Sequence, residues 1–443
     1  MKKLLLLTLL AGCLARQATA APAADLTLRV APERDVIYNS GSREVVVQID
    51  LDGRRPEQGK RAPMNLAVVL DRSGSMQGAK IEKARQAACV AVDSLADNDF
   101  FSLVTFDNAT DVLIAPERVG GGRNRDDLKS RIDRIRPGGG TAIHAGVTLG
   151  AQQVRRNLAR EYVNRVILLS DGIANVGPSR TRDLADLGRD LRRDGLAVTT
   201  IGLGDDYNED LMTALAEASN ANYYYVRDAE KLPGIFAEEL GGARSLVARG
   251  VTIRIRVPEG VRLKEIIGRP EIECRGRTVD ITLPEYFGGD KRRFLARCVV
   301  EEKASAPLEV ATVDLQYEKA EGGKAEAQNQ AAKIGFTDEE KKADASVRMD
   351  VAKEVSITEN RLAKEKAVKL ADEGRGKDAA EVLRGQAARN EAVPAAAQVP
   401  GLALENSKLE AAAKEVEEQG RLGKGSRKQM QYENWQDKYQ KAR

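Results

Sequence analysis

An apolar run at residues 65–70, followed at once by Asp71, constrains the fold of this chain more than any other feature. The run Asn-Leu-Ala-Val-Val-Leu is almost uninterrupted, which is typical of a parallel strand that is covered on both faces. Residues 81–95 then carry apolar side chains at helical spacing. A buried strand followed by an amphipathic helix predicts one unit of an α/β sheet.

The same alternation continues to about residue 245. We predict strands at 100–106, 166–169, 198–201 and 223–226, and helices at 128–135, 142–158, 184–191, 211–218 and 232–240. Parallel strands that are joined through helices have right-handed crossovers, so helices lie on both faces of a sheet whose strand order reverses. Residues 64–245 are therefore predicted to form an α/β domain with a doubly wound, mostly parallel, Rossmann-like sheet.

The segments on either side of this domain alternate apolar and polar residues with a period of two, which is typical of antiparallel strands. Such segments occur at 26–30 and 45–51, and again at 251–257, 261–267, 279–283, 294–300, 310–317 and 331–336. The N-terminal piece, 21–63, holds too few strands to bury a core alone. We therefore predict that it joins residues 246–337 in one antiparallel β-sandwich, into which the α/β domain is inserted.

The composition changes at about residue 338 to one rich in Ala, Glu, Lys and Arg. This composition predicts a helical C-terminal region over 338–443, with helices at 349–370, 378–386 and 408–419. Charge dominates the last part of the chain, which we expect to be partly disordered.

Residues 1–20 have the pattern of an export signal, with two lysines before a short apolar run. Two cleavage patterns compete. Residues 10–13, Leu-Ala-Gly-Cys, resemble a bacterial lipobox in which Cys13 is lipidated, and residues 18–20 fit ordinary signal cleavage. The lipobox is favoured because all four of its positions fit. Either pattern predicts an exported protein, periplasmic or at the cell surface, which a lipid on Cys13 would attach to a membrane.

No later stretch of the sequence is long and apolar enough for a transmembrane helix. The chain has 70 basic and 67 acidic residues, and this near balance argues against a nucleic-acid partner. Cys274 and Cys298 lie in or beside neighbouring predicted strands, so a disulfide between them is one alternative for an exported chain.

Oxygen-bearing side chains follow the predicted strands of the α/β domain. Asp71-Arg-Ser-Gly-Ser75 follows the first strand, Thr141 follows three glycines at the start of a helix, and Asp171 follows the strand at 166–169. Ligands of open α/β sheets bind beyond the carboxyl ends of the strands, where the strand order reverses. Hard divalent cations take oxygen ligands. The predicted metal ligands are thus Asp71, Ser73, Ser75, Thr141 and Asp171, and Mg²⁺ is favoured over Mn²⁺ or Ca²⁺.

These five residues resemble the metal-ion-dependent adhesion site of the von Willebrand factor type A family, and the likeness extends over residues 64–245. The resemblance implies that Asp71, the two serines and Thr141 contact the cation, while Asp171 contacts it directly or through water. It also implies an open coordination position that takes an Asp or Glu of a protein partner. The expected function is metal-dependent adhesion or protein–protein interaction at the bacterial cell envelope.

Two other functions remain as alternatives. One is a structural envelope protein whose α/β domain does not adhere to a partner. The other is a metal-assisted hydrolase, against which the sequence shows no Ser-His-Asp motif, no zinc-ligand cluster and no histidine other than His144. We therefore predict that the chain is not an enzyme.

Overall fold

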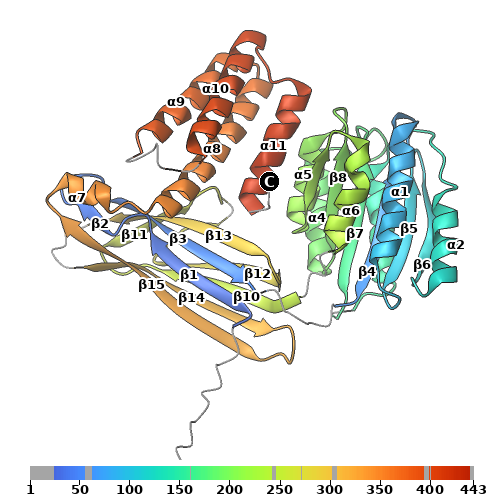
Figure 1. The fold of residues 1–443 in the computed structure, drawn as a ribbon, viewed down its shortest axis with the longest axis horizontal. Coiled ribbons are helices and arrows are strands. Elements are labelled where there is room, and N and C mark those ends of the chain that lie inside the picture. Colours follow the sequence, from blue (N-terminus) through green and yellow to red (C-terminus); the bar gives the residue numbers. More distant parts are fainter. Residues whose placement is uncertain are drawn as a thin grey trace, which may run out of the picture.

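The computed structural model describes residues 24–54, 62–159, 161–241, 246–270, 272–301, 307–393, 399 and 401–439. The predicted export signal at 1–20, with Cys13, lies outside the described residues. The described chain forms three parts, which are an α/β domain, a β-domain of two sheets and a group of C-terminal helices (Figure 1).

Six strands form the sheet of the α/β domain, in the order β6-β5-β4-β7-β8-β9. They are β4 (Met64–Asp71), β5 (Phe100–Phe106), β6 (Thr110–Arg118), β7 (Val163–Ser170), β8 (Ala197–Leu203) and β9 (Tyr223–Val226). All neighbours pair in parallel except β5 and β6. β6 was not predicted from the sequence, because an edge strand needs no continuous apolar run, and only Ile114 of this strand is buried.

Helices cover both faces of this sheet. One face carries α1 (Ala79–Ser94), α2 (Gly122–Ile132) and α6 (Leu232–Gly241), and the other carries α3 (Ile143–Arg155), α4 (Thr181–Arg193) and α5 (Glu209–Ala218). Because β4 lies between two cores, all eight of its residues are buried. This explains the continuous apolar run at 65–70 and confirms the predicted doubly wound α/β fold.

The β-domain consists of two sheets, with strand orders β1-β3-β13-β11 and β12-β10-β14-β15-β2. The strands before the α/β domain are β1 (Leu26–Pro32), β2 (Val36–Tyr38) and β3 (Glu44–Gly53). Those after it are β10 (Leu246–Arg256), β11 (Val261–Ile266), β12 (Thr278–Phe287), β13 (Lys291–Val300), β14 (Leu308–Lys319) and β15 (Ala325–Thr337). Both sheets mix early and late strands, so the α/β domain is an insertion in an antiparallel sandwich, as predicted, apart from the short parallel pair of β2 and β15.

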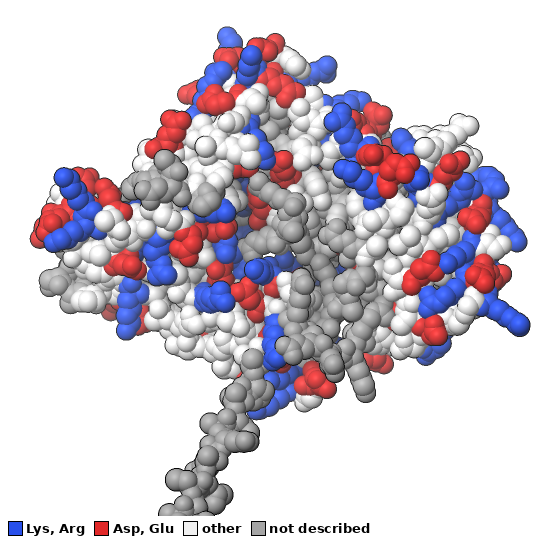
Figure 2. Space-filling model, in the orientation of Figure 1, with Lys and Arg blue, Asp and Glu red and all other residues white. Residues whose placement is uncertain are grey.

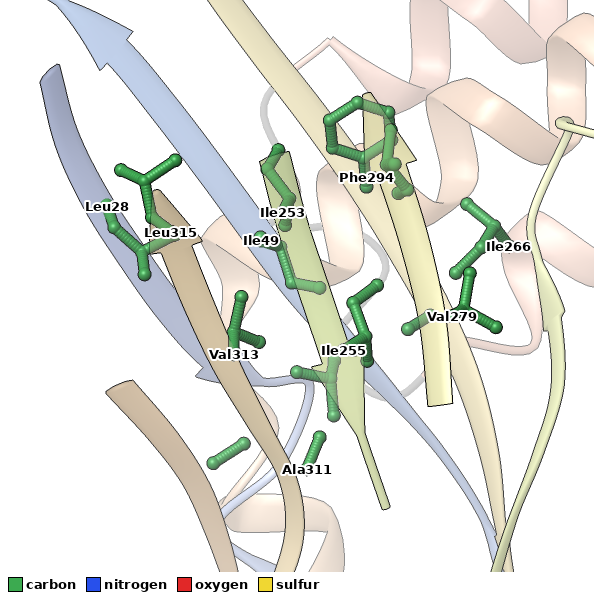
Figure 3. Close-up of a cluster of buried hydrophobic side chains, with 14 of the residues drawn as sticks. Leu28, Ile49, Ile253, Ile255, Ile266, Val279, Phe294, Ala311, Val313 and Leu315 are labelled. Atoms are coloured by element: carbon green, nitrogen blue, oxygen red, sulfur yellow. The ribbon is translucent and has the colours of Figure 1, made fainter. Parts of the chain in front are cut away.

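The core of the β-domain is aliphatic. Figure 3 shows Leu28, Ile49, Ile253 and Val313 among the side chains that fill it. Cys298 is buried in the same core, where desolvation raises the pKa of its thiol to about 12. Cys274 packs at the edge of this core, and both cysteines are free thiols in the structure, so the disulfide alternative is not formed there.

The C-terminal region contains α7 (Glu340–Ala345), α8 (Met349–Asp372), α9 (Gly376–Glu391), α10 (Leu402–Gln419) and α11 (Lys424–Tyr439). Where the sequence indicates a partly disordered end, residues 424–439 form the helix α11, while 440–443 lie outside the described residues. Figure 1 shows α11 between the other C-terminal helices and the α/β domain. Trp435 of α11 is only 3% exposed and packs edge-on against Tyr223 of β9. This burial against another domain orders a segment whose own sequence is mostly polar.

Over the described residues, no helix combines the length and the hydropathy needed to cross a membrane. On the face drawn in Figure 2, basic and acidic side chains are interspersed over all three parts of the chain. This mixture agrees with the nearly balanced composition.

Candidate metal centre

The strand order of the α/β domain reverses between β4 and β7. From β4 the chain continues outward through β5 and β6, and it then returns to the other side of β4 to form β7, β8 and β9. Asp71 is the last residue of β4, and Asp171 directly follows the last residue of β7. Both carboxylates therefore lie at the switch point, at the carboxyl edge of the sheet, where open α/β sheets bind ligands.

Backbone hydrogen bonds tie the loops of this edge together. The amide of Gly74 donates to the carbonyl of Gly139 at 3.0 Å, and the amide of Gly138 donates to the carbonyl of Arg72 at 2.7 Å. These bonds join the loop after β4, which includes the short 3₁₀ helix η1 (Gly74–Met76), to the glycine loop that precedes α3. Main-chain bonds of this kind fix the loop positions independently of any ligand.

Side-chain bonds connect four of the five predicted ligands. The Ser73 amide donates to Asp71 Oδ1 at 2.7 Å, and the hydroxyls of Ser73 and Ser75 are 3.0 Å apart. Ser75 Oγ then donates to Asp171 Oδ1 at 2.7 Å. Asp71, Ser73 and Asp171 are buried, whereas Ser75 is exposed, so the cluster reaches from the interior to the surface.

The fifth predicted ligand, Thr141, lies beside Gly172, close to Asp71. A Cβ atom at this glycine would lie 2.8 Å from Thr141 Oγ1 and 3.6 Å from Asp71 Oδ2. The hydroxyl and the carboxylate therefore border a space that any side chain at this position would occupy. The structure thus places all five predicted residues on one edge of the sheet.

Asp71 is a buried carboxylate that has no cationic partner in the described part of the chain. Its side chain is fully buried, and among the described residues no Lys or Arg forms an ion pair with it. Desolvation raises the pKa of Asp71 to about 6, against the lowering effect of hydrogen bonds from Ser170 and Ser73. A buried charge normally requires a compensating partner. A divalent cation among these oxygens would supply that charge, so the residues present fit such an ion.

The donor set is rich in hydroxyls and poor in the usual metal-binding side chains. Within the described ranges, no group of three or more His, Cys, Asp or Glu is placed to hold a metal. Two carboxylates and three hydroxyls, with water, are the hard oxygen ligands that suit Mg²⁺ and do not suit zinc.

Three further residues contribute to this edge that were not predicted from the sequence. Ser170 Oγ donates to Asp71 Oδ2 at 2.5 Å, and Asn175 Oδ1 accepts the Thr141 amide at 2.8 Å. Lys80 Nζ lies 2.5 Å from Asp171 Oδ2. Ser170 adjoins Asp171 in the sequence and could have been considered, but nothing in the sequence indicates where the Asn175 and Lys80 side chains point.

The fold and this edge define an α/β domain with an oxygen-lined site at its switch point. Residues 65–238 match the family model of the von Willebrand factor type A domain. The chain therefore contains a domain of this family, as the resemblance predicted. Domains of this family commonly mediate interactions between proteins.

Two solved structures share the fold of the chain beyond this domain. A von Willebrand factor type A protein from Catenulispora acidiphila superposes with a TM-score of 0.67 at 17% identity, over 95% of this chain and 98% of that chain. The ArnB paralog VWA2 from Sulfolobus acidocaldarius gives a TM-score of 0.54 at 18% identity, over 90% of this chain and 100% of that one. At these identities the likeness concerns the fold alone.

Among curated relatives, an uncharacterized protein of Synechocystis sp. is 27% identical over 238 residues, which are 54% of this chain and 54% of that protein. The first relatives matched are thus covered over about half of their length or less.

Proposed function

We propose that this chain is a metal-dependent protein-interaction module of the bacterial cell envelope, and that Asp71, Ser73, Ser75, Thr141 and Asp171 hold a divalent cation, Mg²⁺ in the first place. The observation that carries the proposal is Asp71. It is a fully buried carboxylate surrounded by hydroxyls, and no described residue supplies its counter-charge.

The bound cation would supply an electrophilic centre with a coordination position for an oxygen of the partner. The chain's own residues prepare that position. Ser75 is exposed, so the centre opens to the surface on its side, while the buried Asp71 and Asp171 stay out of reach of a partner. A carboxylate of an Asp or Glu is the partner group that such a centre favours.

The proposed location at the cell envelope depends on export of the chain. The pattern of residues 1–20 supports secretion, and the lipobox at 10–13 supports a lipid anchor on Cys13. The partner would then be another protein of the periplasm or cell surface. The proposal assigns no catalytic step to the chain.

Titration calorimetry of the full chain with Mg²⁺, Mn²⁺ and Ca²⁺ tests the cation. We expect binding at one site, which Asp71→Ala abolishes, because the substitution removes a carboxylate at the end of β4. Asp190→Ala is the matched control, since Asp190 is an exposed residue of α4 that pairs with Arg193. If none of the three ions binds to the wild type, the metal hypothesis is wrong.

Capture of partners from envelope extracts tests the interaction. We expect proteins that are retained in Mg²⁺ and lost in EDTA or with Asp71→Ala. Retention that is indifferent to EDTA would favour a structural role for the domain. Substrate turnover that is lost in Asp71→Ala would favour the hydrolase instead.

A further inference from the structure

Lys80 places a positively charged side chain at the candidate metal centre. It is the second residue of α1, and its Nζ lies 2.5 Å from Oδ2 of the fully buried Asp171. The other oxygen of that carboxylate accepts the Ser75 hydroxyl at 2.7 Å. Asp171 is therefore shared between a proposed metal ligand and an internal cation.

The end of the Lys80 side chain also lies near the loop that follows β8. A Cβ atom at Gly204 in this loop would lie 3.8 Å from Lys80 Nζ, which is ordinary van der Waals contact. Asp206, in the same loop, is bonded by Lys424 of α11 at 3.0 Å. Asp206 is thus paired with Lys424, while Lys80 pairs with Asp171.

The charges of the centre can be counted from these contacts. Asp71 and Asp171 contribute two negative charges and Lys80 one positive charge, which leaves a net charge of −1. The nearby pair of Arg72 and Asp107, at 3.0 Å, adds nothing to the sum. A divalent cation would bring the centre to +1, whereas without Lys80 the loaded centre would be neutral.

We propose that Lys80 determines which partner group the centre accepts, because its ammonium weakens cation binding but leaves the loaded centre positive, so that an anionic carboxylate is favoured over a neutral ligand. This inference rests on the proposed function and adds a specificity residue to it. Lys80 is one third exposed, close enough to the surface to act on an incoming group through the electric field.

Lys80→Met tests the proposal, because it keeps the stem and removes the charge. Calorimetry should show Mg²⁺ binding ~10-fold tighter than in the wild type, since the ammonium that pairs with the proposed ligand Asp171 would repel the cation and is gone in this variant. Lys83→Met is the matched control on the same helix, where Lys83 pairs with Glu230 at 2.7 Å. Lys80→Gln provides a second neutral variant that can still donate a hydrogen bond to Asp171.

Anion binding should change in the opposite direction. Acetate is titrated into the Mn²⁺-loaded chain, and its binding is followed through the water proton relaxation that bound Mn²⁺ causes. We expect acetate to bind several-fold more weakly to both neutral variants than to the wild type and to Lys83→Met. Lys80→Arg, which keeps the charge, should bind acetate like the wild type.

The outcomes separate this inference from the proposed function. If the wild type binds no metal, the proposed function fails and the role of Lys80 fails with it. If the wild type binds metal but both neutral variants have unchanged metal and acetate affinities, the role of Lys80 is wrong and the metal centre stands. Weaker Mg²⁺ binding in both neutral variants would likewise overturn it, because Lys80 would then merely position Asp171.

Discussion

Asp71 and Glu209 are two buried carboxylates of the same domain with different kinds of partner. Glu209, at the start of α5, is 6% exposed and accepts Lys428 Nζ at 2.6 Å. A second cation, Arg427, also contacts it, and both belong to α11. Asp71 is less exposed still, yet its hydrogen-bond donors among the described residues are neutral groups, such as the Ser73 amide and the Ser170 hydroxyl.

The difference shows which buried carboxylate receives its counter-charge from the protein and which one requires an ion from solution. At α5 the counter-charges come from a helix more than two hundred residues away in the sequence, so that surface is closed by the protein. At the carboxyl edge of β4 the described residues bring Lys80 to Asp171 but no cation to Asp71. An ion from solution is therefore expected at Asp71 and not at Glu209.

Removing the carboxylate of Glu209 should cause the largest loss of stability. Glu209→Ala leaves Lys428 buried without its partner, and removing one member of a buried ion pair costs about 3–5 kcal/mol. We expect α11 to detach from the α/β domain. Hydrogen exchange of α11 and the fluorescence of Trp435, the only tryptophan, measure this.

Glu230→Ala is the control for that substitution, because Glu230 pairs with Lys83 on the surface and is 65% exposed. Exposed pairs contribute about 0–1 kcal/mol, so α11 should keep its protection. Unchanged protection in Glu209→Ala itself would show that the aromatic packing and the remaining ion pairs, such as that of Lys438 with Glu217, hold the helix without Glu209.

Neutralising Asp71 should change the free energy of unfolding by a smaller amount and in the opposite direction. Asp71→Asn keeps the shape of the side chain and removes a desolvated charge, so the metal-free chain should gain about 1–3 kcal/mol in free energy of unfolding. Urea denaturation in EDTA measures this gain. In Mg²⁺ the order should reverse, because only the wild type can be stabilised by the ion. A loss of stability in EDTA would mean that the described contacts already compensate Asp71.

The contrast also shows what the sequence can reveal. The alternation of strands and helices, the insertion in the β-sandwich and the five oxygen donors can be predicted, because they depend on local periodicity or on short motifs beside a strand end or a helix start. Lys80 and α11 depend on long-range contacts. The charged sequence at 424–439 is typical of a solvated tail. In the structure, Arg427 and Lys428 of this segment form ion pairs with Glu209.

Filling the space at Gly172 should weaken cation binding only moderately. Gly172→Ala places a methyl group 2.8 Å from Thr141 Oγ1, so the threonine side chain must shift or rotate away from its present position. We expect Mg²⁺ affinity in calorimetry to fall about tenfold, which is about 1.4 kcal/mol. The control is Gly138→Ala on the same edge, because a Cβ atom there would meet nothing within 4 Å. Docking of α11 should be unaffected in both variants, since Glu209 keeps its cations. Equal affinity in the two variants would show that the cation lies away from Thr141.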